Sequence, residues 1–467
     1  MEELKKNQTH IAEICGYSST GAGVCRIGGR AVFVDKALVG ETWEILILKV
    51  SSSAVFGKGI KLLKASDQRR QPPCPSFGKC GGCDLMHMSY EEELHFKLSR
   101  VNDALQRIGG LDFSVEKIIG SSDKSIYNYR NKAIYAVGSA DNGSAVTGFF
   151  RERSHSIVPV DSCLIQTELS SDCAAALRSF MDENAVPAYN EADGSGLIRH
   201  LFTRCSLKYP QSVACVVSTK RLGDLEAKLV QALRAACPQL TGIVLCVNKS
   251  EGNTVLSGSF NTLWGSEYIE DELCGLKFRI SPMSFYQINP RQAEGLYQLA
   301  VNYAIPVSNE GSLNEYLGGS GTVLDLYCGT GTISLCLAKK AKMVIGAEIV
   351  EAAVENARRN AEENGIENVR FICADASLAA AQLAAEGIRP DAVVVDPPRK
   401  GLASDVVDII CEMQPLTVVY VSCDPATLAR DVKHFSENGY LPQKGMAVDM
   451  FPRCAHVETV LQLVREG

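Results

Sequence analysis

The hydrophobic pattern divides the chain into segments of different character. Residues 10–64 alternate apolar and polar positions in short runs separated by glycine turns, which predicts a small β-barrel. Residues 89–109 carry apolar positions at helical spacing and end in a double glycine, which predicts a helix. Residues 126–280 are mostly strand-like, with one helical stretch at 224–237, and predict a β-rich middle domain.

From about residue 320 the pattern changes to apolar strands that alternate with amphipathic helices. This alternation predicts a doubly wound α/β domain of the Rossmann-like type, built on a parallel sheet. We therefore expect three domains, at residues 1–68, 69–280 and 281–467, with the helix at 89–109 packed on the third.

Charge and cysteine content refine this picture. No stretch is apolar and long enough to act as a signal peptide or to cross a bilayer, so we expect a cytoplasmic protein with no membrane contact. In a reducing compartment the 18 cysteines are expected to be buried thiols, metal ligands or reactive groups rather than disulfides.

The net charge of −7 argues against a nucleic-acid partner, but the charge is unevenly distributed. Residues 1–70 hold eleven Lys and Arg against seven Asp and Glu. Residues 124–153 interleave basic with aromatic side chains, among them Lys124, Arg130 and Lys132. This pattern suits RNA, because bases stack on aromatics while cations meet phosphates; it also fits a solvated strand surface.

A candidate cofactor site follows the first strand of the α/β domain. Gly329 and Gly331 lie between that strand and a helix, where a missing side chain lets the backbone approach a ligand. Glu348 ends the next strand and suits a ribose, and Asp375 ends the third and suits an adenine edge. Ser334 replaces the third glycine of a nicotinamide fingerprint, which favours S-adenosylmethionine over a dinucleotide.

Candidate catalytic groups lie at two later strand ends. Asp396 is followed by two prolines and then by Arg399, where enzymes that methylate exocyclic amines have an aromatic residue. Cys423 ends the following strand just before a predicted helix, whose dipole is expected to favour a thiolate.

Methylation of uracil carbon 5 requires a thiolate that adds to carbon 6 and a base that later removes the carbon 5 proton. His456 and Glu458 lie at the start of the last apolar strand, and we favour Glu458 as that base. This chemistry requires Cys423 and Glu458 to lie close together.

A group of cysteines suggests a metal centre. Cys74, Cys80 and Cys83 have the spacing C-x5-C-x2-C, and Cys163 is a candidate fourth ligand. Four thiolates suit either zinc or an iron–sulfur cluster, and the spacing alone does not choose between them. The C-x3-C-x2-C motif of radical enzymes that use S-adenosylmethionine is absent.

Together these motifs resemble the bacterial RNA uracil-5-methyltransferases, especially the branch that acts on 23S ribosomal RNA. The resemblance spans almost the entire chain and implies a class I methyltransferase domain, an N-terminal TRAM domain (an OB-like RNA-binding barrel) and a monomer. It implies a four-iron, four-sulfur cluster on Cys74, Cys80, Cys83 and Cys163, nucleophile Cys423 and base Glu458. The cofactor contacts that it implies are Gln287, Tyr327, Gly329, Gly331, Thr332, Glu348, Asp375 and Asp396.

Other functions remain open at this stage. The chain could be a transfer-RNA uracil-5-methyltransferase, although that branch typically lacks the barrel and the cysteine cluster. It could methylate carbon 5 of cytosine or a small molecule. It could also be a non-catalytic RNA-binding or redox-sensing protein that carries an iron–sulfur cluster.

Overall fold

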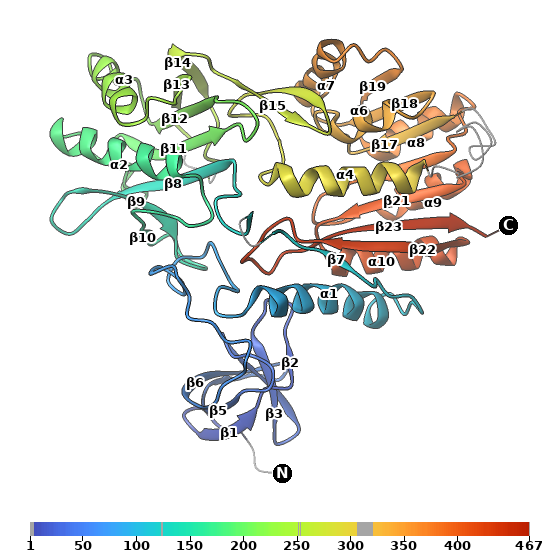
Figure 1. Ribbon diagram of the computed structural model, residues 1–467, viewed down its shortest axis with the longest axis horizontal. Coiled ribbons are helices and arrows are strands. Elements are labelled where there is room, and N and C mark those ends of the chain that lie inside the picture. The colour runs from blue at the N-terminus through green and yellow to red at the C-terminus, as the bar shows by residue number, and fades with distance from the viewer. Residues whose placement is uncertain (1–3, 123–124, 251, 253, 306–320, 467) are drawn as a thin grey trace.

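A computed structural model describes the whole chain except residues 1–3, 123–124, 251, 253, 306–320 and 467 (Figure 1). Lys124, one of the basic residues noted above, lies outside the described residues. None of the helices in the described part of the chain is long and apolar enough to span a membrane.

The C-terminal part is built on an eight-stranded sheet of order β19-β18-β17-β20-β21-β23-β22-β7. Neighbouring strands from β17 to β21 pair in parallel, whereas β23 pairs antiparallel with both β21 and β22. The strands are β7 (Ile118–Ile119), β17 (Thr322–Leu326), β18 (Met343–Glu348), β19 (Val369–Cys373), β20 (Ala392–Val395), β21 (Thr417–Ser422), β22 (Tyr440–Val448) and β23 (Glu458–Arg465).

Helices cover both faces of this sheet, which confirms the predicted doubly wound α/β architecture (Figure 1). One face packs against α4 (Pro290–Ala304), α6 (Thr332–Ala338) and α7 (Glu351–Glu363). The other packs against α1 (Tyr90–Arg107), α8 (Ala376–Ala385), α9 (Ser404–Met413) and α10 (Pro425–Glu437). The strands of such a sheet are buried on both sides and therefore read as continuous apolar runs.

The middle part contains a seven-stranded sheet of order β10-β9-β8-β11-β12-β13-β14. One face packs on α2 (Glu168–Glu183) and α3 (Leu225–Ala236), and the other joins the core that surrounds α4. The sequence analysis missed α2, although Leu169, Cys173, Leu177 and Phe180 have helical spacing and are buried. The strands are β8 (Lys132–Ser139), β9 (Ala145–Phe150), β10 (Ile157–Pro159), β11 (Ile198–Cys205), β12 (Ser212–Ser218), β13 (Gly242–Val247) and β14 (Ser259–Gly265), and the hairpin of β15 (Ile269–Leu273) and β16 (Leu276–Ile280) follows.

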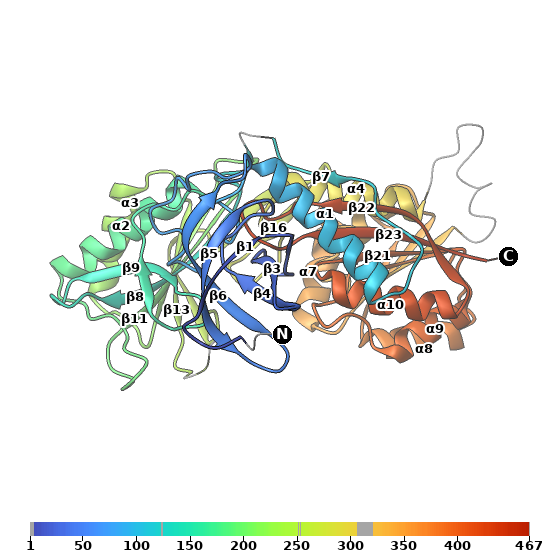
Figure 2. The same cartoon turned by 90° about the horizontal axis from the view of Figure 1, so that it is seen from below.

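The N-terminal part is a six-stranded sheet with its own small apolar core. Its strands are β1 (Thr9–Glu13), β2 (Gly16–Tyr17), β3 (Gly23–Ile27), β4 (Arg30–Val34), β5 (Thr42–Val50) and β6 (Val55–Lys64). Short strands therefore form where they were predicted, while the TRAM assignment stays a prediction. Figure 1 shows this sheet below α1, and Figure 2 shows both from below.

Helix α1 connects this sheet to the C-terminal part. Its N-cap is Ser89, whose hydroxyl accepts a hydrogen bond from the Glu92 backbone N–H. Val101 and Leu105 are buried as predicted, but Ile108 is 49% exposed because the helix ends at Arg107. The helix buries charged side chains as well, among them Glu93 and Lys97.

Candidate active site

Cys423 follows β21 and Glu458 begins β23, and these are neighbouring strands of the large sheet. Strand β21 pairs antiparallel with β23, and the last printed pair is Ser422 with Thr459. Continuing this register by one residue sets Cys423 opposite Glu458. Directly opposed side chains in such a ladder have their Cβ atoms about 4.5–5.5 Å apart. Cys423 is half-buried and Glu458 is 6% exposed.

Asp396 and Arg399 complete the electrostatic setting of this pair. Burial raises the pKa of Glu458 to about 8; the Asp396 carboxylate adds to this rise and the Arg399 guanidinium opposes it. Burial also raises the pKa of Asp396 to about 7. The two carboxyl groups therefore hold protons more readily than they would in water.

The prediction of a thiolate favoured by the helix dipole is wrong for the free protein. Burial, with contributions from Glu458 and Asp396, raises the pKa of Cys423 to about 11. The N-cap of α10 is Asp424, whose carboxylate accepts hydrogen bonds from Ala426 N and Thr427 N at 2.9 and 3.1 Å. This carboxylate satisfies the end of the helix and offsets its positive potential.

The predicted cofactor residues gather at the same sheet edge, where the carboxyl ends of parallel strands meet. Gly329 and Gly331 both have positive φ, at 54° and 81°, and a Cβ on Gly331 would lie 2.9 Å from the Phe371 ring. The Glu348 carboxylate accepts hydrogen bonds from Gly329 N at 3.1 Å and from Val350 N at 2.9 Å. The glycine loop and the acidic residue are thus fixed to one another before any ligand is bound.

The remaining predicted cofactor residues surround this loop. Thr332 at the start of α6 hydrogen-bonds Tyr297 with 3.4 Å between their oxygens, and Gln287 also hydrogen-bonds this tyrosine. Asp375 is exposed and is the N-cap of α8, where it accepts a hydrogen bond from Ser377 N at 3.0 Å. Tyr327 has a positive φ of 66° immediately after β17.

The four predicted metal ligands also come together. Cys74, Cys80, Cys83 and Cys163 line one cavity of about 50 Å³, beside the apolar rings of Phe77 and Phe149. Burial raises the pKa of the Cys80 thiol, and the neighbouring thiols of Cys163 and Cys74 add to this rise. Within the described residues, no three His, Cys, Asp or Glu side chains are arranged to bind a single metal ion.

A larger cleft of about 790 Å³ separates the N-terminal sheet from α1 and the start of α10. The sheet contributes Tyr17 and Phe33, and α1 contributes His95 and Arg100. Pro425, the first residue of α10 and two residues after Cys423, is among the residues that line it. The cleft therefore lies beside the start of the helix that follows the nucleophile candidate.

Comparison with known proteins identifies the class of enzyme. Residues 313–466 match the family model "tRNA (Uracil-5-)-methyltransferase". The chain is 39% identical to an RNA methyltransferase of Clostridium tetani over 99% of this chain and 98% of the relative, and 40% identical to one of Clostridium acetobutylicum with the same coverage. This chain belongs to the RNA uracil-5-methyltransferase family.

The RNA methyltransferase also resembles a solved structure over its full length. The Pyrococcus abyssi tRNA (uracil-54, C5)-methyltransferase, solved with S-adenosyl-L-homocysteine, superposes with a TM-score of 0.76 at 28% identity, covering 97% of this chain and 99% of that one. The class I methyltransferase fold is thus confirmed, and S-adenosylmethionine is the methyl donor. The alternative of a nicotinamide dinucleotide as cofactor is therefore excluded.

The structure adds residues to this methyltransferase site that the sequence analysis did not assign. Tyr297 of α4 lies between Thr332 and Gln287, and the nearby Asp396 contributes to raising its pKa. From the sequence, Arg399 was noted only because it stands where enzymes that methylate exocyclic amines have an aromatic residue. In the structure it is the cation beside both Cys423 and Glu458. Tyr297 offered no sequence signal beyond helical periodicity, whereas Arg399 follows the double proline.

A further cysteine lies beside the cysteine cavity. Cys454 is buried, its thiol contacts that of Cys83, and its Sγ donates to the Gly82 carbonyl at 3.2 Å. It stands four residues before Glu458. The cysteine cavity and the candidate base of the methyltransferase are therefore joined by one short piece of chain.

Proposed function

We propose that this protein methylates carbon 5 of uridine in RNA, with Cys423 as covalent nucleophile and Glu458 as base. The observation that carries the proposal is the placement of these two side chains opposite each other between β21 and β23, at the edge that holds the glycine loop and Glu348. A candidate nucleophile and a candidate base at facing positions beside the proposed cofactor site match the two requirements of the chemistry.

The reaction balances with these groups. The Cys423 thiolate forms a bond to carbon 6 of the uracil, which makes carbon 5 nucleophilic. S-adenosylmethionine, when bound, would supply the methyl group: carbon 5 would bond to the methyl carbon, the methyl–sulfur bond would break, and S-adenosylhomocysteine would leave with that electron pair. Glu458 then takes the proton from carbon 5, the bond between carbon 6 and sulfur breaks, and the thiolate leaves with its electron pair.

The resting thiol must first lose its proton, because its pKa is about 11. Arg399 lowers the pKa of both Cys423 and Glu458, and its guanidinium therefore favours the charged form of each group. We assign to Arg399 the role of favouring the thiolate of Cys423 and the carboxylate of Glu458.

We assign cofactor binding to the residues at the glycine loop. Glu348 is placed for the ribose hydroxyls and Asp375 for the adenine edge, because an acceptor at the end of each strand faces the same ligand. The remaining contacts are proposed at Gln287, Tyr327, Gly329, Gly331, Thr332 and Asp396.

RNA is expected to approach through the cleft between the N-terminal sheet and α1. Burial lowers the pKa of His456 to about 4, and the nearby cations Arg399 and Arg100 add to this shift. The protein is acidic overall, so these two cations beside the proposed active site are a local feature suited to phosphates. We propose the N-terminal sheet as a TRAM domain that holds the flanking RNA.

We propose ribosomal RNA as the first candidate substrate. The reason is that the chain has a cysteine cluster and an N-terminal sheet, and the transfer-RNA branch of the family typically lacks both parts. Transfer RNA is the second candidate, since the Pyrococcus abyssi enzyme that covers 97% of this chain is a transfer-RNA methyltransferase. In either RNA the uridine must leave its stack to reach Cys423, so a loop or an opened helix is expected.

We propose a four-iron, four-sulfur cluster on Cys74, Cys80, Cys83 and Cys163. One observation supports it: all four thiols line one cavity. In a cluster each thiolate binds a different iron, so its ligands lie farther apart than those of one zinc ion.

The decisive experiment is transfer of labelled methyl from S-adenosylmethionine to unmodified ribosomal and transfer RNA, followed by nucleoside analysis. We expect 5-methyluridine in ribosomal RNA, its loss in Cys423→Ala, and its retention in the matched control Cys411→Ala on α9. Label in transfer RNA would reassign the substrate, label in cytosine would reassign the base, and no label in any RNA would favour a binding protein.

A further inference from the structure

The loop at residues 449–457 joins β22 to β23 and delivers Glu458. Val448 pairs with Glu458 across these two strands, so the loop leaves the sheet beside the base and returns at the base itself. Within the loop, Met450 N donates to the Val448 carbonyl at 3.1 Å and Cys454 N to the Phe451 carbonyl at 3.0 Å. The contacts that fix this loop therefore also fix Glu458, the first residue of β23.

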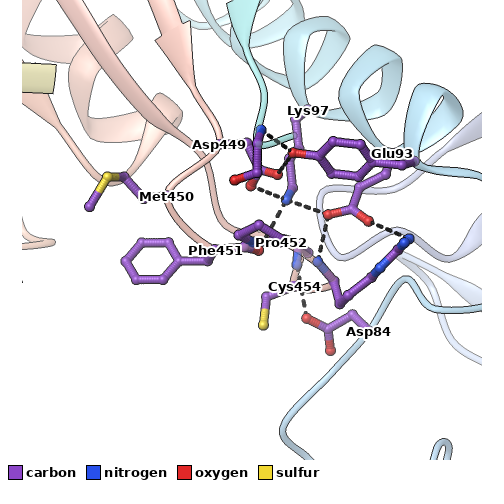
Figure 3. Close-up of polar contacts among 12 residues, drawn as sticks. Asp84, Glu93, Lys97, Asp449, Met450, Phe451, Pro452 and Cys454 are labelled. Atoms are coloured by element: carbon purple, nitrogen blue, oxygen red, sulfur yellow. Dashed lines mark hydrogen bonds and ion pairs between the residues drawn. The ribbon is translucent and has the colours of Figure 1, made fainter. Parts of the chain in front are cut away.

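A buried group of charges holds one side of this loop (Figure 3). The Lys97 ammonium on α1 donates to Asp449 Oδ1 at 2.6 Å, to Glu93 Oε1 at 2.7 Å and to the Phe451 carbonyl at 3.1 Å. The side chains of Lys97, Glu93 and Asp449 are all 0% exposed. Tyr90 donates to the second oxygen of Asp449 at 2.6 Å.

Glu93 extends this cluster along the loop. It accepts hydrogen bonds from the backbone N–H of Arg453 at 2.7 Å and from its guanidinium at 3.2 Å. Arg453 has a positive φ of 71°, a conformation that an L-residue keeps only when its surroundings hold it. Two carboxylates thus face two cations, so the cluster is neutral although it is buried.

The segment that carries the cysteines holds the other side. The Arg453 carbonyl accepts from Asp84 N at 2.9 Å and from Leu85 N at 3.0 Å, and the Asp84 carboxylate accepts from Ala455 N at 2.9 Å. Asn289 donates to the Met450 carbonyl and Tyr129 to the Pro452 carbonyl, each at 3.1 Å.

Helix α1 reaches the nucleophile as well. Arg100 donates to the Ala455 carbonyl at 2.7 Å, and its guanidinium lies 3.8 Å from Asp424, the residue after Cys423. Glu93, Lys97 and Arg100 are spaced four and three residues apart and so form one stripe of α1. That stripe contacts the chain next to the nucleophile and the chain next to the base.

We propose that the cluster of Lys97, Glu93 and Asp449 is a positioning device that sets Glu458 against the carbon 5 proton; this inference rests on the proposed function. Burying an ion cluster is costly, and apolar side chains often stabilise a core equally well. What the cluster adds is a fixed geometry, because its hydrogen bonds end on Asp449, Phe451 and Arg453 within the loop itself.

The test measures the methylated covalent adduct between protein and labelled RNA in Asp449→Asn, Lys97→Met and the milder Arg100→Met. A base displaced by roughly 1 Å is expected to slow release of product about 10²-fold. The adduct should accumulate, while affinity for S-adenosylmethionine stays unchanged. Asp449→Asn retains the shape of the side chain and therefore disturbs folding least.

Two reference proteins make the outcome decisive. Tyr440→Phe removes a buried hydrogen bond to the Pro415 carbonyl, at the opposite end of β22 from the loop, and should lower thermal stability without adduct accumulation. Glu458→Ala should accumulate the adduct; if it does not, the proposed function fails rather than the positioning role. Loss of methylation without adduct, accompanied by weaker cofactor binding, would overturn the positioning role, and so would wild-type turnover in all three variants.

Discussion

Glu458 stands opposite Cys423 because β23 runs antiparallel to β21, against the direction of the parallel strands beside it. The carboxyl end of β21 therefore meets the amino end of β23, and the proposed nucleophile at one strand end faces the proposed base at the other strand's start. The arrangement brings two residues 35 positions apart to one end of the sheet.

Replacing each member of the pair should stop the reaction at a different step. Cys423→Ala is expected to form no covalent adduct and to lose methylation, while it still binds S-adenosylmethionine. Glu458→Ala should form the methylated adduct and fail to release it, with a loss of about 10²- to 10⁴-fold in turnover. Denaturing gels of labelled RNA with each variant check this, and free product at the normal rate from Glu458→Ala would exclude it as base.

Release of product should depend on pH through Glu458. Its pKa is raised to about 8, so at lower pH most of the population carries a proton and cannot accept another. The release rate is expected to rise about tenfold per pH unit below this value and to level off above it. Quenched single-turnover measurements from pH 6 to 9 test the expectation, and a flat profile would contradict it.

Arg399 should control where that rise occurs. The guanidinium lowers the pKa of Glu458 and of Cys423, so Arg399→Ala is expected to shift the whole profile to higher pH and to slow the reaction at pH 7. Arg399→Lys keeps the positive charge and serves as the matched control. Equal pH profiles for Arg399→Ala and Arg399→Lys would show that a positive charge at this position does not control the pKa of Glu458 or Cys423.

Glu348 should contribute to cofactor affinity through charged hydrogen bonds. Glu348→Gln is expected to weaken binding of S-adenosylmethionine by about 1.5–3 kcal/mol, the usual worth of a hydrogen bond to a charged group. Glu351→Gln, an exposed residue at the start of α7, is the control. Isothermal titration without RNA measures both, and unchanged affinity in Glu348→Gln would remove Glu348 from the ribose site.

Iron and sulfide should depend on the four clustered cysteines. Protein purified without oxygen is expected to contain equal amounts of iron and acid-labile sulfide, which Cys83→Ser loses and Cys15→Ser, an exposed cysteine, retains. Zinc without sulfide in the wild-type protein would instead assign the site to a single ion.

The sequence by itself determined the parts of the site that follow from local pattern. Gly329, Glu348, Asp375 and Asp396 each end or follow an apolar strand, and parallel strands bring their carboxyl ends to one edge whatever the rest of the chain does. The predicted alternation of strands and helices was also confirmed, because it too follows from the local hydrophobic pattern. The helix α2 was missed although its periodicity was present.

Only the tertiary structure decided how the reaction centre is held and charged. The high pKa of Cys423 depends on burial and on neighbouring carboxylates. Both raise this pKa, whereas the sequence had suggested that the helix dipole would lower it. Lys97 and Asp449 are 352 positions apart, and Cys454 meets Cys83 from another part of the chain. Such contacts leave no periodic signal, because they depend on which surfaces pack together and which charges they enclose.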